Sequence, residues 1–150
     1  MNRPFRLMLI DDNYADCLLA EEALNYPGLE CEFTFSDSGP AVLASFKAGA
    51  QLPDLLLLDV NMPEMNGFEI LKVIKTTSEL WHLPVGMLST SKRPKDITEA
   101  YDLQANFYIV KSLEFSGFQR QLSALLSFWR SAMLPSPKSH KSAKAVPAPA

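Results

Sequence analysis

Five short apolar runs recur along the chain, separated by segments whose apolar residues lie three and four positions apart. The runs occupy residues 7–10, 31–35, 55–58, 85–88 and 107–110. The segments after them predict helices over residues 15–26, 40–48, 68–76, 95–103 and about 114–133, the first of them capped by Asn13. Strands that alternate with helices are typical of a parallel sheet with helices on both faces. The sequence therefore predicts an open, doubly wound (βα)5 fold of the α/β class.

The composition of the runs indicates where each strand lies in the sheet. Runs 55–58, 85–88 and 107–110 are almost wholly apolar, which favours strands whose two faces are both covered by helices. Run 31–35 alternates apolar and polar residues, which favours an edge strand. If the strand order is 2-1-3-4-5, the first and third runs are neighbours.

The end of the chain has a different composition from the rest. From Pro135 onward it consists largely of Pro, Ser, Lys and Ala without apolar periodicity, which predicts a folded domain at 1–134 and a disordered tail at 135–150. The net charge is −3, and without the three lysines of the tail it is −6. These values are too small to predict binding to nucleic acid or to an anionic membrane.

The cysteines and the N-terminus favour a cytoplasmic protein. Cys17 and Cys31 lack the spacing of a metal or redox site, which favours two buried thiols in a reducing compartment. The apolar run near the N-terminus is too short for a signal peptide. No stretch approaches the roughly 18 apolar residues that a membrane span needs.

Polar side chains follow four of the five runs. Asp11 and Asp12 follow the first run, Asp59 the third, Ser89 the fourth and Lys111 the fifth. Each alone is explained by a turn, a helix cap or a solvated charge. Ligands of open parallel sheets, however, bind beyond the carboxyl ends of the strands. Carboxylates gathered there repel one another unless a cation lies among them, and their oxygens suit Mg²⁺. The sequence therefore predicts a Mg²⁺ site at this edge of the sheet.

These polar residues lie within segments that resemble the signature blocks of response-regulator receiver domains. The blocks are DD at 11–12, LLLLDVNMPEMNG at 55–67, PVGMLSTS at 84–91 and ANFYIVK at 105–111. They occur in the family's order and spacing over about residues 5–133. The resemblance implies a flavodoxin-like fold and a single-domain signalling protein rather than an enzyme. It also implies phosphorylation of an aspartate, in the presence of Mg²⁺, by a sensor histidine kinase or a histidine phosphotransfer protein.

Position by position, the resemblance implies which residues hold the metal. Asp59 would be the phosphoacceptor and a metal ligand. Asp12 would bind Mg²⁺ directly, whereas Asp11 would act through the water shell of the metal. The backbone carbonyl of Asn61 would be a further ligand.

The resemblance also implies which residues respond to the phosphoryl group. Ser89 would bond a phosphoryl oxygen, and Lys111 would pair with the phosphoryl group. Tyr108 occupies the aromatic switch position, although it can equally be filler beside a half-buried strand. The chain departs from the family at Ser112, where receivers usually have a proline, often after a cis bond. A cis bond before another residue costs about 3–4 kcal/mol, so the loop either keeps that geometry at a cost or is rebuilt.

Three other functions compete with that of a phosphorylatable switch. Phosphatases of similar architecture usually have Asp-x-Asp after the first strand, whereas this chain has Asp11-Asp12-Asn13. A degenerate receiver that only binds proteins would not need the acids, Ser89 and Lys111 together. A flavin carrier would need a phosphate-binding Ser/Thr/Gly loop after the first strand, which this chain lacks. The phosphorylatable switch is therefore preferred.

The last predicted helix raises the question of partners. ANFYIVKS and FWRSAMLP resemble single-domain regulators that serve bacterial phytochrome kinases, which implies a light-sensing kinase. Leu126 and Phe128 flank the core stripe of this helix on opposite sides, so its apolar arc approaches about 160°. We hypothesise that one flank, with Phe128 as the preferred anchor, joins a self-complementary homodimer or docks the kinase. Alternatively, the helix packs more deeply within its own domain.

Overall fold

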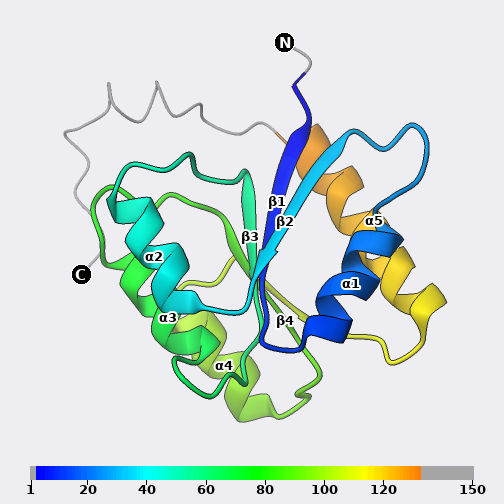
Figure 1. Ribbon diagram of the computed structural model, residues 1–150. Coiled ribbons are helices and arrows are strands. Elements are labelled where there is room, and N and C mark those ends of the chain that lie inside the picture. Colours follow the sequence, from blue (N-terminus) through cyan, green and yellow to red (C-terminus); the bar gives the residue numbers. More distant parts are fainter. Residues whose placement is uncertain (1–2, 133–150) are drawn as a thin grey trace.

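Five parallel strands form one sheet in the order β2-β1-β3-β4-β5, as predicted (Figure 1). The strands are β1 (Phe5–Ile10), β2 (Cys31–Ser36), β3 (Leu55–Leu58), β4 (Val85–Ser89) and β5 (Phe107–Val110). The helices are α1 (Tyr14–Ala23), α2 (Gly39–Lys47), α3 (Gly67–Lys75), α4 (Pro94–Asp102) and α5 (Phe115–Ser131). The computed structural model describes residues 3–132. The predicted tail at 135–150, and Met133 at the predicted end of the last helix, lie outside the described residues.

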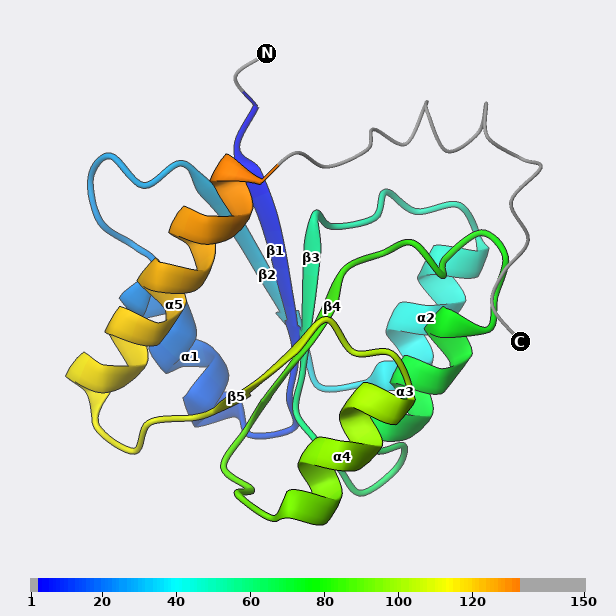
Figure 2. The same ribbon diagram turned by 180° about the vertical axis from the view of Figure 1, so that it is seen from behind.

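Helices cover both faces of the sheet, with α1 and α5 on one face and α2, α3 and α4 on the other (Figure 2). Successive side chains of a strand point to opposite faces. In β3, Leu55 and Leu57 therefore pack with α1 and α5, whereas Leu56 and Leu58 pack with the other three helices. All four are at most 1% exposed. The run of four leucines is explained by burial on both sides.

The two edge strands differ from the covered strands. In β2 the residues alternate between half-buried and exposed for most of its length, as predicted for an edge. The prediction for residues 107–110 was wrong in one respect, because β5 is only half-buried along its length. It forms the other edge of the sheet and so has one neighbouring strand. Its first residue, Phe107, lies against Gly86, where an added Cβ would come within 2.0 Å of the ring.

Local signals place the ends of the helices. Asn13 caps α1 as predicted, because its side chain accepts a hydrogen bond from the backbone N–H of Asp16. The helix ends at Ala23 rather than near residue 26, since the N–H of Leu24 closes the last turn on Ala20. Asn66 and Glu69 form a capping box at the start of α3.

Of the two thiols predicted to be buried, only one is fully buried. Cys17 is buried, whereas Cys31 is only partly buried because it lies on the edge strand, and both are free thiols. Burial raises the pKa of Cys17 to about 12 and that of Cys31 to about 11, so both stay protonated at neutral pH. Within residues 3–132, no helix is both long enough and apolar enough to cross a membrane.

Candidate functional site

Asp11, Asp12 and Asp59 converge at the carboxyl edge of the sheet. Strands β1 and β3 are neighbours, and the backbone N–H of Asp59 donates to the carbonyl of Ile10 at 3.0 Å. One carboxylate oxygen from each of the three acids lies within 4.8 Å of the others. The predicted convergence is therefore confirmed, and its cause is the strand order.

The two consecutive acids after β1 have different surroundings. Asp11 is fully buried, and its two oxygens accept hydrogen bonds from the Asn13 N–H at 2.9 Å and from Lys111 Nζ at 2.9 Å. Asp12 is exposed. A carboxylate with both oxygens engaged is poorly suited to bind a metal directly, whereas an exposed one is well suited. The division of metal-binding roles between Asp11 and Asp12 stays a prediction.

Asp59 is a carboxylate whose ionisation is disfavoured by its surroundings. Burial and the neighbouring charge of Asp11 raise its pKa from 3.8 to about 6, although Lys111 acts in the opposite direction. A cation among the acids would relieve this repulsion. The three carboxylates supply only hard oxygen ligands, which is the donor set that Mg²⁺ prefers. The residues present therefore fit a divalent cation.

The loop that follows Asp59 packs tightly against it. The backbone N–H of Gly67 donates to the carbonyl of Val60 at 3.0 Å. A Cβ at Gly67 would lie 2.1 Å from the carbonyl oxygen of Asp59, so only glycine allows this approach. The predicted metal ligand Asn61 lies in this loop and is exposed. Gly67 is thus a supporting residue of the site that sequence reasoning did not single out.

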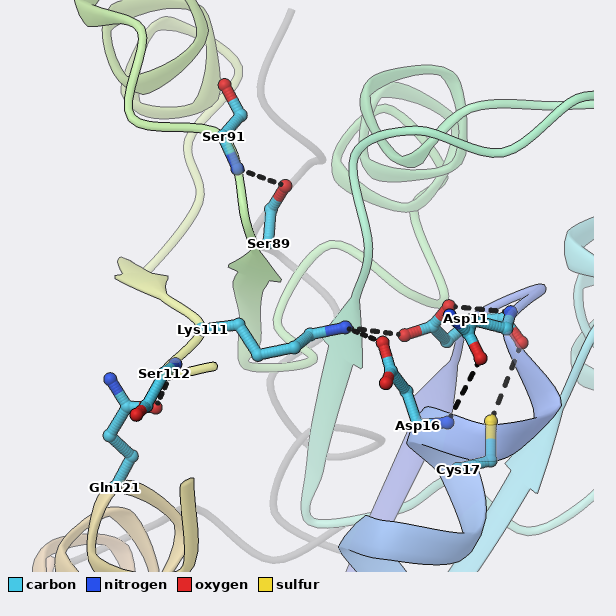
Figure 3. A network of polar contacts seen from close by, with 9 residues as sticks. Asp11, Asp16, Cys17, Ser89, Ser91, Lys111, Ser112 and Gln121 are labelled. Atoms are coloured by element: carbon cyan, nitrogen blue, oxygen red, sulfur yellow. Dashed lines mark hydrogen bonds and ion pairs between the residues drawn. The ribbon is translucent and has the colours of Figure 1, made fainter. Parts of the chain in front are cut away.

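Lys111 is buried and holds two carboxylates together. Figure 3 shows its side chain reaching toward Asp11 and Asp16, with Nζ 2.9 Å and 2.8 Å from their oxygens. Burial alone would lower the pKa of Lys111, but hydrogen bonds and ion pairs with Asp16 and Asp11 raise it above its ordinary value. Sequence reasoning missed Asp16. Its position one helical turn after Asp12, on the first turn of α1, was the available signal.

Ser89 and Tyr108 meet at Ser91, in the loop that leads to α4. Ser89 is fully buried, and its Oγ accepts from the backbone N–H of Ser91 at 3.2 Å (Figure 3). The Tyr108 hydroxyl donates to the carbonyl of Ser91 at 2.9 Å. The Ser91 hydroxyl bonds the buried carboxylate of Asp96 on α4 at 2.5 Å. Sequence reasoning gave Ser91 no role and missed Asp96, although the two residues link the site to α4.

The loop after Lys111 does not contain the cis peptide bond that receivers often have at this position. The chain contains no cis peptide bond within residues 3–132, so the bond between Lys111 and Ser112 is trans. The N–H of Ser112 donates to the side chain of Gln121 on α5 at 2.9 Å.

Comparison with known proteins identifies the family. Residues 7–122 match the response regulator receiver domain. The chain belongs to this family. It is 31% identical to response regulator Rcp1 of Synechocystis over 133 residues, which cover 85% of this chain and 90% of Rcp1. The chain is thus a receiver of the kind found in response regulators of two-component systems, a signalling family.

Solved receiver structures share the fold. The phosphorylated cyanobacterial phytochrome response regulator RcpA is 37% identical and superimposes with a TM-score of 0.83, covering 89% of this chain and 99% of RcpA. The Mn²⁺-bound form of Rcp1 is 30% identical with a TM-score of 0.80, covering 89% of this chain and all of that chain. The flavodoxin-like fold predicted for this receiver is confirmed.

Proposed function

We propose that this receiver accepts a phosphoryl group on Asp59 from a histidine kinase, with Mg²⁺ bound at the acidic cluster. The observation that carries the proposal is the convergence of Asp11, Asp12 and Asp59 within 4.8 Å, with the buried ammonium of Lys111 beside them. Asp11 and Asp12 can attract a cation, and Asp59 can act as the nucleophile. The ammonium of Lys111 can offset the negative charge of the incoming phosphoryl group. The protein then acts as a signalling switch.

Mg²⁺ would be held by Asp12, Asp59 and the backbone carbonyl of Asn61, with Asp11 acting through bound water. When bound, the metal supplies positive charge that offsets the repulsion between the carboxylates and a phosphoryl group. Two observations support this assignment: Asp12 is exposed, and both oxygens of Asp11 are already engaged. The Mn²⁺-bound Rcp1 adds support, because it is a metal-bound relative of the same fold.

The chain's own residues position the reacting groups. A carboxylate oxygen of Asp59 attacks phosphorus and forms the acyl phosphate, the phosphorus–nitrogen bond to the kinase histidine breaks, and the leaving imidazole nitrogen takes up a proton from solvent water. The Oγ of Ser89 accepts from Ser91, which leaves its own hydrogen to donate to a phosphoryl oxygen. Lys111 already lies within the cluster and need only exchange its bond to Asp16 for one to the phosphoryl group.

The signal would leave through Ser91. A phosphoryl oxygen that draws Ser89 toward Asp59 also pulls on the N–H of Ser91. Ser91 is in turn bonded to Tyr108 through its carbonyl and to Asp96 through its hydroxyl. Displacement of this loop therefore remodels the surface formed by α4, β5 and α5. A partner that reads this surface, or a second histidine that takes the phosphoryl group onward, would complete the pathway.

Asp12→Ala tests the metal assignment. It should weaken Mg²⁺ binding at least about tenfold and slow labelling by a small phosphodonor, because a direct oxygen ligand is lost. Calorimetric titration with Mg²⁺ measures the first effect. Glu79→Ala is the matched control, since it removes an exposed acid before β4, at the opposite end of the sheet. Full labelling of Asp12→Ala in EDTA would contradict the proposed site.

The partner kinase is proposed to be of the phytochrome type. The support is the similarity to Rcp1 and to RcpA, which is described as a cyanobacterial phytochrome response regulator. A cytoplasmic location is proposed as well, supported by the free thiols of Cys17 and Cys31, which suit a reducing compartment. Phosphotransfer from each histidine kinase of the source organism identifies the donor.

The last helix offers a candidate contact for a homodimer. The two flanking residues differ, because Leu126 is fully buried whereas Phe128 is 64% exposed. Packing of α5 within its own domain therefore explains why Leu126 is apolar, but it does not explain the exposed Phe128. Phe128 packs edge-on against Trp129 with ring centroids 5.7 Å apart, and most of its ring remains exposed as apolar surface. We propose that this surface contributes to a homodimer.

Phe128→Glu is expected to give a soluble monomer from a dimeric parent at micromolar concentration, as measured by light scattering. A charge placed in an apolar contact opposes association, whereas at an exposed position it has little effect on folding. Gln119→Glu, on the same helix, is the control for added charge. A parent that is monomeric with and without phosphodonor would eliminate the dimer and leave the kinase as the candidate occupant.

A further inference from the structure

The side chain of Gln121 on α5 bonds the backbone on both sides of Lys111. Its Oε1 accepts from the N–H of Ser112 at 2.9 Å, and its Nε2 donates to the carbonyl of Val110 at 2.7 Å. Figure 3 shows the carboxamide lying against Ser112, while the side chain of Lys111 extends away toward Asp11. One side chain thus holds the residue before the lysine and the residue after it.

This pair of bonds continues the sheet beyond its edge. In an extended strand, the backbone groups of alternate residues point to the same side. The N–H of Lys111 donates to the carbonyl of Ser89 at 2.7 Å, toward β4. The carbonyl of Val110 and the N–H of Ser112 therefore point away from β4, to the open edge. Gln121 occupies that edge with one acceptor and one donor, as the N–H and carbonyl of one residue in a sixth parallel strand would.

Gly117 also allows α5 to lie close to the loop that follows Lys111. A Cβ at Gly117 would lie 2.3 Å from the Oγ of Ser112, so glycine lets the first turn of α5 come close to the loop. The Oγ of Ser112 in turn accepts from the N–H of Glu114 at 3.3 Å, just before the helix. Ser112 brings a backbone N–H that requires an acceptor when it is removed from water. Gln121, one turn beyond Gly117, provides that acceptor.

We propose that Gln121 is a positioning residue for the phosphorylation site and acts through Lys111. Its carboxamide keeps the backbone at Lys111 extended, which directs the ammonium to the acidic cluster. The ammonium lies at hydrogen-bonding distance from Asp11 and Asp16, so a rotation of the backbone would move it out of reach. The inference rests on the proposed function, in which Lys111 pairs with the phosphoryl group.

Gln121→Met removes both bonds with little change in length. At saturating Mg²⁺ and well below the unfolding temperature, the rate of labelling by an acyl phosphate should fall about tenfold, because small misplacements of a reacting group are costly. Gln121→Glu should give an intermediate rate, since an ionised carboxylate accepts from Ser112 but cannot donate to Val110. Gln119→Met, on the same helix, should label at the parental rate. Labelling of Gln121→Met at the parental rate would overturn the proposal.

A double-mutant cycle separates positioning from a merely structural role. In a Lys111→Met background, Gln121→Met should slow labelling no further, because no ammonium remains to be positioned. The same loss in both backgrounds would mean that Gln121 only supports the fold, which also overturns the proposal. The cycle also tests the proposed function separately. If Lys111→Met alone labels at the parental rate, the role of Lys111 fails, whatever Gln121→Met does.

Discussion

Asp59→Asn should abolish labelling by a small phosphodonor in Mg²⁺ while leaving the fold intact. An amide oxygen is a far weaker nucleophile than a carboxylate, so we expect a loss of at least about 10³-fold, similar to that of other essential catalytic groups. Mass spectrometry after reaction with an acyl phosphate measures the labelled fraction. Far-ultraviolet circular dichroism checks that the variant is folded.

The outcome of this experiment distinguishes Asp59 from its neighbours. Asp37→Asn removes an exposed carboxyl after β2 and should label as the parent does. Equal labelling of Asp59→Asn and the parent would mean that the phosphoacceptor lies elsewhere. Labelling that persists at a reduced level would point to Asp11 or Asp12 as a substitute nucleophile, because both lie in the same cluster.

The same variant should be more stable than the parent in EDTA at pH 8. The folded pKa of Asp59, about 6, lies above its ordinary value of 3.8. The folded state therefore holds this proton more tightly, and ionisation costs stability as the pH rises through that interval. We expect a gain of about 1–2 kcal/mol at pH 8, after allowing for partial exposure to solvent, and none below about pH 4. Urea unfolding at the two pH values measures it.

Lys111→Ala has the second large expected effect, which falls on stability as well as on labelling. It leaves Asp11, which is fully buried, without its cationic partner. Removing one member of a buried ion pair typically costs about 3–5 kcal/mol, and the lower end is expected here because Asp16 remains partly exposed. Urea unfolding at pH 8 in EDTA measures the change in the free energy of unfolding.

Metal binding should survive the loss of Lys111. The cluster becomes more negative without the ammonium, so Mg²⁺ should bind at least as tightly and should recover part of the lost stability. Labelling should nevertheless be slow, because no cation pairs with the phosphoryl group. Lys111→Gln, which keeps hydrogen-bond donors without the charge, is the matched variant and should cost less stability. If Lys111→Ala loses metal binding and labelling together, the lysine is structural.

The alternation of apolar runs and helical segments was enough to predict the fold. The ranges predicted for β3 and β5 match the structure, and the strand order is confirmed. These features are local, because the two-residue period of a strand and the spacing of a helix are written in consecutive residues. The convergence of Asp11, Asp12 and Asp59 required in addition that the first and third strands be neighbours, which fits the flavodoxin-like fold implied by the resemblance to receiver domains and is confirmed by the pairing of β1 with β3. Once two strands are neighbours and parallel, the residues just beyond their carboxyl ends must lie close together.

The partners of the polar side chains were decided only by the tertiary structure. Lys111 meets Asp16 across 95 positions of the chain, and that contact depends on how α1 and β5 lie about the sheet. The two hydrogen bonds from Gln121 to Ser112 and Val110 depend on the close approach of α5 that Gly117 permits. The helical wheel could not tell Leu126 from Phe128, because only the packing of α5 against its neighbours decides which flank is buried. The sequence by itself determined which residues stand at the carboxyl ends of the strands, since strand periodicity is local. Only the tertiary structure decided which of them bond, because hydrogen bonds and ion pairs require contacts between elements that no local pattern specifies.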